Sequence, residues 1–250
     1  MHTLRSIIFA SALSGLLAGL VVTGIQIFGT TPLILQGEAY ETAEPAASEV
    51  VHQYGVEHQH DAVAVDHQSA AGHSHDEEAW APADGAERFF YTAGANILIG
   101  IGFAIVLTAL MSLRGTQVSA REGIVWGLAA FTSVMLMPSI GLPPELPGSA
   151  AGPLLARQAW WIVTAVATAG GIGLSLLRRE WWAYVAAFAL IVAPHLIGAP
   201  QPAAGEVSLA PAALEQRFIL VALGTSLVFW LLLGPLSAAF LGRLRDQHHA

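Results

Sequence analysis

The chain has 250 residues, of which 54% are hydrophobic and only 11% are charged, and its mean hydropathy is +0.59. A soluble globular protein carries about 25% charged residues. This composition therefore excludes an ordinary water-facing surface and indicates a protein embedded in lipid. The chain has no cysteine, which excludes disulfides, thiolate metal sites and thiol nucleophiles.

The formal net charge of −8 is unevenly distributed along the chain. Residues 38–88 contain 12 of the 18 acidic residues and one of the ten arginines. This segment carries a net charge of −11, and the rest of the chain carries +3. The acidity therefore belongs to one segment and not to the hydrophobic body.

Six apolar segments approach the length that crosses a membrane, which is about 20 residues for roughly 30 Å of hydrocarbon. In chain order they are 7–29, 91–113, 123–140, 159–177, 181–198 and 218–241, and the third and fifth are the shortest. The first is too long for the apolar region of a signal peptide, so we expect a retained helix. Tryptophans at segment ends suit the membrane interface: Trp160, Trp161, Trp181 and Trp182. We predict an all-α integral membrane protein in which residues 1–250 form a single polytopic domain.

The arginines predict the orientation of these helices, because Lys and Arg accumulate on the cytoplasmic side. With six spans and the N-terminus inside, seven arginines fall inside and three fall outside, namely Arg88, Arg157 and Arg217. This distribution predicts cytoplasmic termini and an extracytoplasmic acidic segment.

A proline and glycine pattern recurs at the outer ends of three segments, in residues 31–38, 137–145 and 193–202. The recurrence predicts three parallel helical-hairpin repeats, related by an axis along the membrane normal. Because proline cannot continue a helix, we expect broken backbone at these ends, which protein or a water-filled cavity must satisfy. Ordinary proline-rich loops at the interface are an equal alternative.

Residues 44–86 form an insertion between the first two spans, and their polar, acidic composition predicts a disordered loop. Imidazole and carboxylate ligands suit zinc, cobalt, nickel and copper(II), and the negative charge concentrates cations. We predict that this loop captures a divalent metal ion with His52, His58, His60, His67, His73, His75, Asp61 and Asp76. The alternatives are a solvated linker and a segment that gains charge near pH 6.5, as histidine does.

Three further candidate metal ligands follow the outer prolines: Glu38, Glu145 and His195. Placed at the outer mouth, they would receive an ion from the loop. The two acids could instead be solvated, and His195 could bond a neighbouring carbonyl. Arg88, Arg157 and Arg217 could pair with Glu38, Glu145 or Glu215, but we favour anchoring to lipid phosphates.

Within the helices, polar and small residues indicate packing. Gln26 and Asn96 predict interhelical hydrogen bonds, and the Gly15 and Gly19 spacing permits close helix approach. The sequence contains neither a His-Glu-x-x-His motif nor a Gly-x-x-x-x-Gly-Lys-Ser/Thr motif. It therefore lacks the signatures of a zinc protease and of a P-loop nucleotide hydrolase, and we do not expect an enzyme.

An ordered set of segments gives the chain a resemblance to a known family: 31–41, the histidine-rich loop, 141–148, 157–161 and 194–200. Together they resemble the CbtA family, the predicted cobalt transporter subunit. The resemblance implies a bacterial inner-membrane protein linked to cobalt supply for cobalamin synthesis. It also implies a small partner, CbtB, with one membrane helix and its own histidines. The family is usually described with five spans, against the six counted above.

We therefore predict the membrane subunit of a cobalt(2+) transporter, which captures the ion with its external loop and passes it through the helix bundle. We expect no prosthetic group and no nucleic-acid partner. Cobalt comes from the resemblance, because the residues alone indicate only a borderline divalent cation, nickel and zinc included. The alternative is a membrane-anchored metal-buffering or sensing module that does not itself transport.

Overall fold

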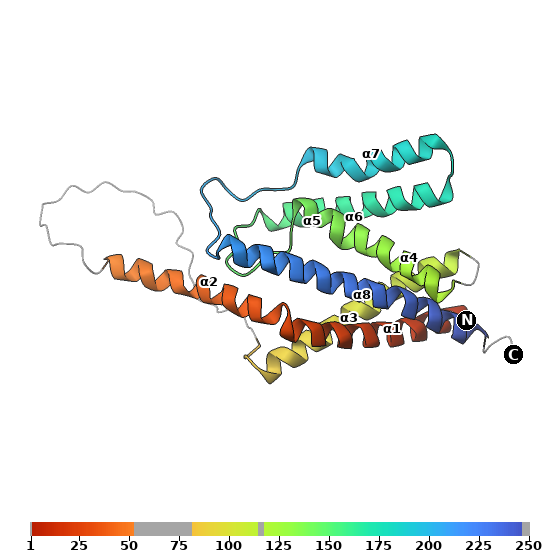
Figure 1. Ribbon diagram of the computed structural model, residues 1–250, viewed down its shortest axis with the longest axis horizontal. Helices are drawn as coiled ribbons and strands as arrows, with labels where there is room; N and C mark the ends of the chain where they lie inside the picture. The colour runs from red at the N-terminus through yellow and green to blue at the C-terminus, as the bar shows by residue number, and fades with distance from the viewer. Residues whose placement is uncertain (1, 53–81, 115–117, 247–250) are drawn as a thin grey trace, which may run out of the picture.

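The computed structural model describes residues 2–52, 82–114 and 118–246, which are helical apart from their connections and contain no strand. In chain order the helices are α1 (His2–Phe28), α2 (Thr31–His52), α3 (Ala86–Leu113), α4 (Ala120–Phe131), the π-helix η1 (Thr132–Leu136), α5 (Met137–Gly141), α6 (Leu154–Leu177), α7 (Trp181–Ile197) and α8 (Ala212–Asp246). The segments α4, η1 and α5 follow one another without a break and form one rod (Figure 1).

Five helices in the described part of the chain are long and apolar enough to cross a membrane. They are Leu4–Phe28, Ala86–Leu113, Ala120–Gly141, Leu154–Leu177 and Ala212–Leu244. The sixth predicted span, α7, is apolar but has 17 residues, a length of about 26 Å at 1.5 Å per residue. The all-α, multi-pass membrane architecture predicted from the sequence is therefore confirmed.

The helices pack as a bundle in which α1 lies against α3 and α8, α4 lies against α8, and α7 lies against α6 (Figure 1). The first predicted hairpin, α1 with α3, is the most extensive contact. The second and third predicted hairpins would pair the rod of α4, η1 and α5 with α6, and α7 with α8. Instead, the rod packs mainly on α8, and α7 packs on α6. Glycines explain the α4–α8 choice, because a Cβ on Gly234 would lie 2.1 Å from the Gly123 carbonyl oxygen.

The α1–α3 contact confirms two predictions about polar and small residues. A Cβ on Gly15 would lie 2.3 Å from the Ile101 backbone nitrogen, so the helices touch through their backbones. The Asn96 side-chain amide donates to Gln26 Oε1 at 2.6 Å and to Thr23 Oγ1 at 3.0 Å. Small residues thus bring the two helices together, and amide and hydroxyl groups bond across the contact.

The prediction that the helices break at the outer prolines is wrong, because the prolines lie within helices. Pro194 lies inside α7, Pro138 lies inside α5, and Pro32 lies in the first turn of α2. A proline removes one backbone donor and crowds one carbonyl, which a wider π turn immediately before Pro138 accommodates. Irregular backbone begins only at Leu142 and Gly198, after the helices end.

Helix α2 continues through the first part of the segment 44–86, as far as His52. Residues 53–81 lie outside the described residues. The start of α1 and the end of α8 lie at one end of the bundle (Figure 1). We call the opposite end the distal end; there α1, α5 and α7 end, and α3, α6 and α8 begin.

Candidate functional site

The segment 142–153, between α5 and α6, packs onto the distal end as a structured connection. Leu146 is buried in a cluster with Leu33 of α2 and with Ala210 and Phe218. A Cβ on Gly37 would lie 2.7 Å from Leu146 Cγ, so α2 has a glycine where this leucine inserts. The connection is thereby fixed between α2 and the start of α8.

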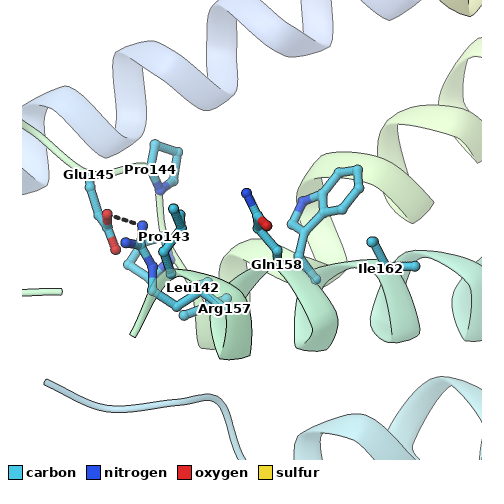
Figure 2. A pocket seen from close by; sticks show the side chains of 9 residues that line it. Leu142, Pro143, Pro144, Glu145, Arg157, Gln158 and Ile162 are labelled. Atoms are coloured by element: carbon cyan, nitrogen blue, oxygen red, sulfur yellow. Dashed lines mark hydrogen bonds and ion pairs between the residues drawn. The ribbon is translucent and has the colours of Figure 1, made fainter. Parts of the chain in front are cut away.

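An ion pair between Glu145 and Arg157 lies in a cavity at this end (Figure 2). The Arg157 guanidinium donates to the Glu145 carboxylate from the first turn of α6. The cavity has a volume of about 450 Å³ and is mainly apolar, and its lining consists of Leu142, Pro143, Pro144, Glu145, Leu154, Arg157, Gln158, Trp161 and Ile162. Its single carboxylate is thus already neutralised by a neighbouring cation.

A second ion pair joins Glu38 of α2 to Arg88 of α3. Both guanidinium NH groups donate to the carboxylate, at 3.0 to 3.3 Å, and Arg88 Nε lies 3.1 Å from Asp84. Two of the three outer arginines therefore pair with the acids, and the expectation that they anchor to lipid is wrong for Arg88 and Arg157. The reason is the tertiary fold, which brings together residues 50 positions apart in the case of Glu38 and Arg88.

His195 has a different environment from the two acids. Its Nε2 atom is buried and has no hydrogen-bond partner among the described residues, so the alternative of a bond from this nitrogen to a carbonyl is not found. The Trp160 ring contacts the imidazole edge to face, with centroids 5.6 Å apart. His195 thus retains an unused nitrogen, which is the atom that binds borderline metals.

Trp160 positions this part of α7, a role that the sequence did not indicate. Its Nε1 donates to the Pro194 carbonyl oxygen at 3.1 Å. On the other side, a Cβ on Gly141 would lie 2.5 Å from the Trp160 ring. Trp160 is buried, because it fills the space between the ends of α5 and α7.

The described residues contain no group of three or more His, Asp or Glu side chains that could hold a metal ion. The structure therefore does not bring Glu38, Glu145 and His195 into one such group. His52 is the last residue of α2. His58, His60, Asp61, His67, His73, His75 and Asp76 lie outside the described residues, so these ligands stay predictions.

A family model described as "Probable cobalt transporter subunit (CbtA)" matches residues 4–242, nearly the whole chain. The chain belongs to the CbtA family. No curated protein and no solved structure matches it. Membership of CbtA confirms the resemblance drawn from the sequence and makes cobalt the expected transported metal. The word subunit in the CbtA description implies a partner subunit.

The structure gives the CbtA segments that carried the resemblance a physical role. In the segment 141–148, Gly141 leaves room for the Trp160 ring and Glu145 pairs with Arg157. Leu146 is buried in the cluster with Leu33, Ala210 and Phe218. Gly148 has a φ of +80°, which residues with a side chain rarely adopt. These motif residues build the connection at the distal end, while the ligand set itself stays a prediction.

Proposed function

We propose that the chain is the membrane subunit of a cobalt(2+) transporter, which captures the ion with its histidine-rich segment and passes it by His195 into the helix bundle. The observation that carries this proposal is the buried Nε2 of His195, which has no protein partner in the described part of the chain. An imidazole nitrogen suits cobalt(2+), and here it is held beside the end of a helix.

Glu38 and Glu145 bind the ion less readily than His195 in this proposal. Each carboxylate is bonded to an arginine, so it binds a metal ion only when that guanidinium releases it. The pairs therefore keep the distal end electrically neutral until a cation arrives. His195 is the candidate that requires no bond to be broken first.

In this proposal, the metal ion is captured before it reaches His195 by the acidic segment 38–88, which carries a charge of −11. His52, His58, His60, His67, His73 and His75, with Asp61 and Asp76, supply nitrogen and oxygen ligands for a borderline divalent ion. The arginine distribution supports cytoplasmic termini and an extracytoplasmic capture segment, and the resemblance to the family implies a bacterial inner membrane. The partner that the word subunit implies is, in our proposal, a small CbtB-like protein with one histidine-bearing helix.

The test is uptake of labelled cobalt by cells that depend on this protein. We expect His195→Ala to abolish uptake, whereas deletion of residues 52–75 chiefly raises the cobalt concentration needed for half-maximal uptake. His195→Gln retains a polar side chain of similar size, and we expect it to fail as well because an amide does not replace the imidazole nitrogen. Nickel and zinc, measured in the same strain, establish the metal preference.

Metal buffering without transport is the competing function. It predicts that cells with and without the protein take up cobalt at the same rate, while the membrane-bound metal falls when residues 52–75 are deleted. Equal uptake rates would therefore overturn the transport proposal.

A further inference from the structure

We propose that Thr164 and Thr168 line a path for a hydrated divalent cation along the buried face of α6, inward from His195. This inference rests on the proposed transport function and adds the intramembrane part of the route. Both side chains are fully buried, and neither hydroxyl has a hydrogen-bond partner among the described residues.

Five other buried hydroxyls in the described part of the chain behave differently. Ser11, Ser14, Thr23, Thr108 and Ser133 each donate to the carbonyl four residues earlier, at 2.7 to 2.8 Å. This back-bonding is the ordinary way for a helix to satisfy a buried Ser or Thr. Thr164 and Thr168 depart from it on two successive turns. Ser237 of α8 is a further buried hydroxyl without a partner among the described residues, but no second such hydroxyl lies one turn away from it.

The position of the two threonines places them between the contacts of α6 with α7. Buried residues on α6 recur at Trp160, Thr164, Thr168 and Gly171, the spacing of one helix face. Trp160 bonds Pro194 and touches His195 at the distal side. On the side away from the distal end, Gly171 lies against Ala187 of α7. A Cβ added to Gly171 would be 2.9 Å from the Ala187 carbonyl oxygen. The hydroxyls therefore begin one turn below the ring that contacts His195.

The chemistry of the two threonines and their surroundings on α6 favours a hydrated ion over a bare one. No charged residue lies between Arg157 and Arg178, so α6 itself offers nothing to neutralise a divalent cation stripped of water. A hydroxyl oxygen accepts hydrogen bonds, and the waters around a cation donate them outward. A polar side chain without a partner in the hydrocarbon region costs free energy, which such a water shell would recover.

Cysteine accessibility tests the path without requiring transport, because the chain has no cysteine of its own. Thr164→Cys and Thr168→Cys, made in the full-length protein in membrane vesicles, are treated with a cationic methanethiosulfonate reagent. Only a thiolate reacts, which requires water. Thr108→Cys is the matched control, because Thr108 is equally buried but bonded to Ser11 and Ala104. Val166→Cys, on the exposed face of α6, is the lipid-facing control.

We expect both path cysteines to react at least about tenfold faster than the two controls, since thiolate formation governs the rate. Rates equal to that of Thr108→Cys would overturn the path. This result stands whether or not the cells take up cobalt, so a failure of the path is distinguishable from a failure of the proposed function.

Isosteric valine variants then test the cation. In the double variant Thr164→Val with Thr168→Val, we expect cobalt uptake to fall at least about tenfold while the melting temperature stays or rises, because no protein hydrogen bond is lost. Thr164→Ser with Thr168→Ser retains the hydroxyls and the uptake. Thr108→Val shows the opposite: a lower melting temperature and unchanged uptake per folded protein. Full uptake by the valine double variant, or a loss of stability like that of Thr108→Val, would overturn the inference.

Discussion

The helix pairs α1–α3 and α6–α7 use similar residues in different ways. In α1–α3, backbones touch at Gly15, the Ser11 and Thr108 hydroxyls bond each other at 2.8 Å, and Asn96 bonds Gln26 and Thr23. In α6–α7, Trp160 donates one bond to a carbonyl, and the hydroxyls of Thr164 and Thr168 bond no described residue. The first pair uses its polar groups to hold the bundle together, whereas the second leaves them available.

The largest expected effect concerns the close approach of α1 and α3. We expect Gly15→Ala to cost about 3 kcal/mol or more, because its Cβ would meet backbone atoms that cannot move aside without separating the helices. Gly24→Ala on the same helix has open space and should be neutral or stabilising by about 0.5 to 1 kcal/mol. Thermal unfolding in detergent measures both. Equal melting temperatures would show that the α1–α3 contact is looser than described.

The glycine of the second pair gives an intermediate effect. At Gly171, two of the three atoms nearest to an added Cβ belong to the flexible Ile191 side chain, so Gly171→Ala should cost only about 1 to 2 kcal/mol. Its neighbour Gly170 has open space and serves as the control. If Gly171→Ala is as damaging as Gly15→Ala, the two pairs do not differ in the rigidity of their contact.

A variant of Asn96 tests how much the hydrogen bonds between α1 and α3 contribute to stability. Asn96→Leu removes both donated bonds and should lower stability by about 1 kcal/mol, the usual scale for interhelical hydrogen bonds in membranes. Gln26→Leu provides the matched loss of one partner. An unchanged melting temperature for Asn96→Leu would contradict the role assigned to this network.

Trp160→Phe removes the one bond from α6 to the Pro194 carbonyl and retains most of the ring. We expect a loss of about 0.5 to 1 kcal/mol and a faster reaction of His195 with diethyl pyrocarbonate, because the imidazole becomes less confined. Trp161→Phe, at an exposed position, is the control. If His195 reacts at the wild-type rate in Trp160→Phe, Trp160 does not position it.

The smallest effect belongs to the distal ion pair. Arg157→Gln and Glu145→Gln should each cost less than about 1 kcal/mol, because the pair is partly exposed and solvent screens it. The double variant should recover part of that loss, since neither charge is left alone. A double variant less stable than both single variants would show that the pair is not the interaction that matters.

Much of the helical architecture follows from the sequence because it depends on local patterns. Apolar length predicts the spans, and the depth of Asn96 and the spacing of Gly15 and Gly19 predict their packing. The prolines misled the prediction of the helix ends, because the backbone stays helical through Pro138 and Pro194 and becomes irregular only four residues later, at Leu142 and Gly198. The site was predicted only as residue types near a common end of the helices. In the sequence, Trp160 indicates an interfacial ring, and the two threonines do not stand out within an otherwise apolar helix.

The sequence by itself determined that this chain lies in a membrane, that its acidity is confined to one histidine-bearing segment, and that its motifs resemble those of CbtA. Only the tertiary structure decided that α4 packs on α8 and that Arg88 and Arg157 neutralise the two glutamates. It also decided that Nε2 of His195 and the hydroxyls of Thr164 and Thr168 find no partner in the described part of the chain. The physical reason is distance along the chain. Composition and periodicity are local properties, whereas a hydrogen-bond partner is set by whichever helix the fold brings alongside.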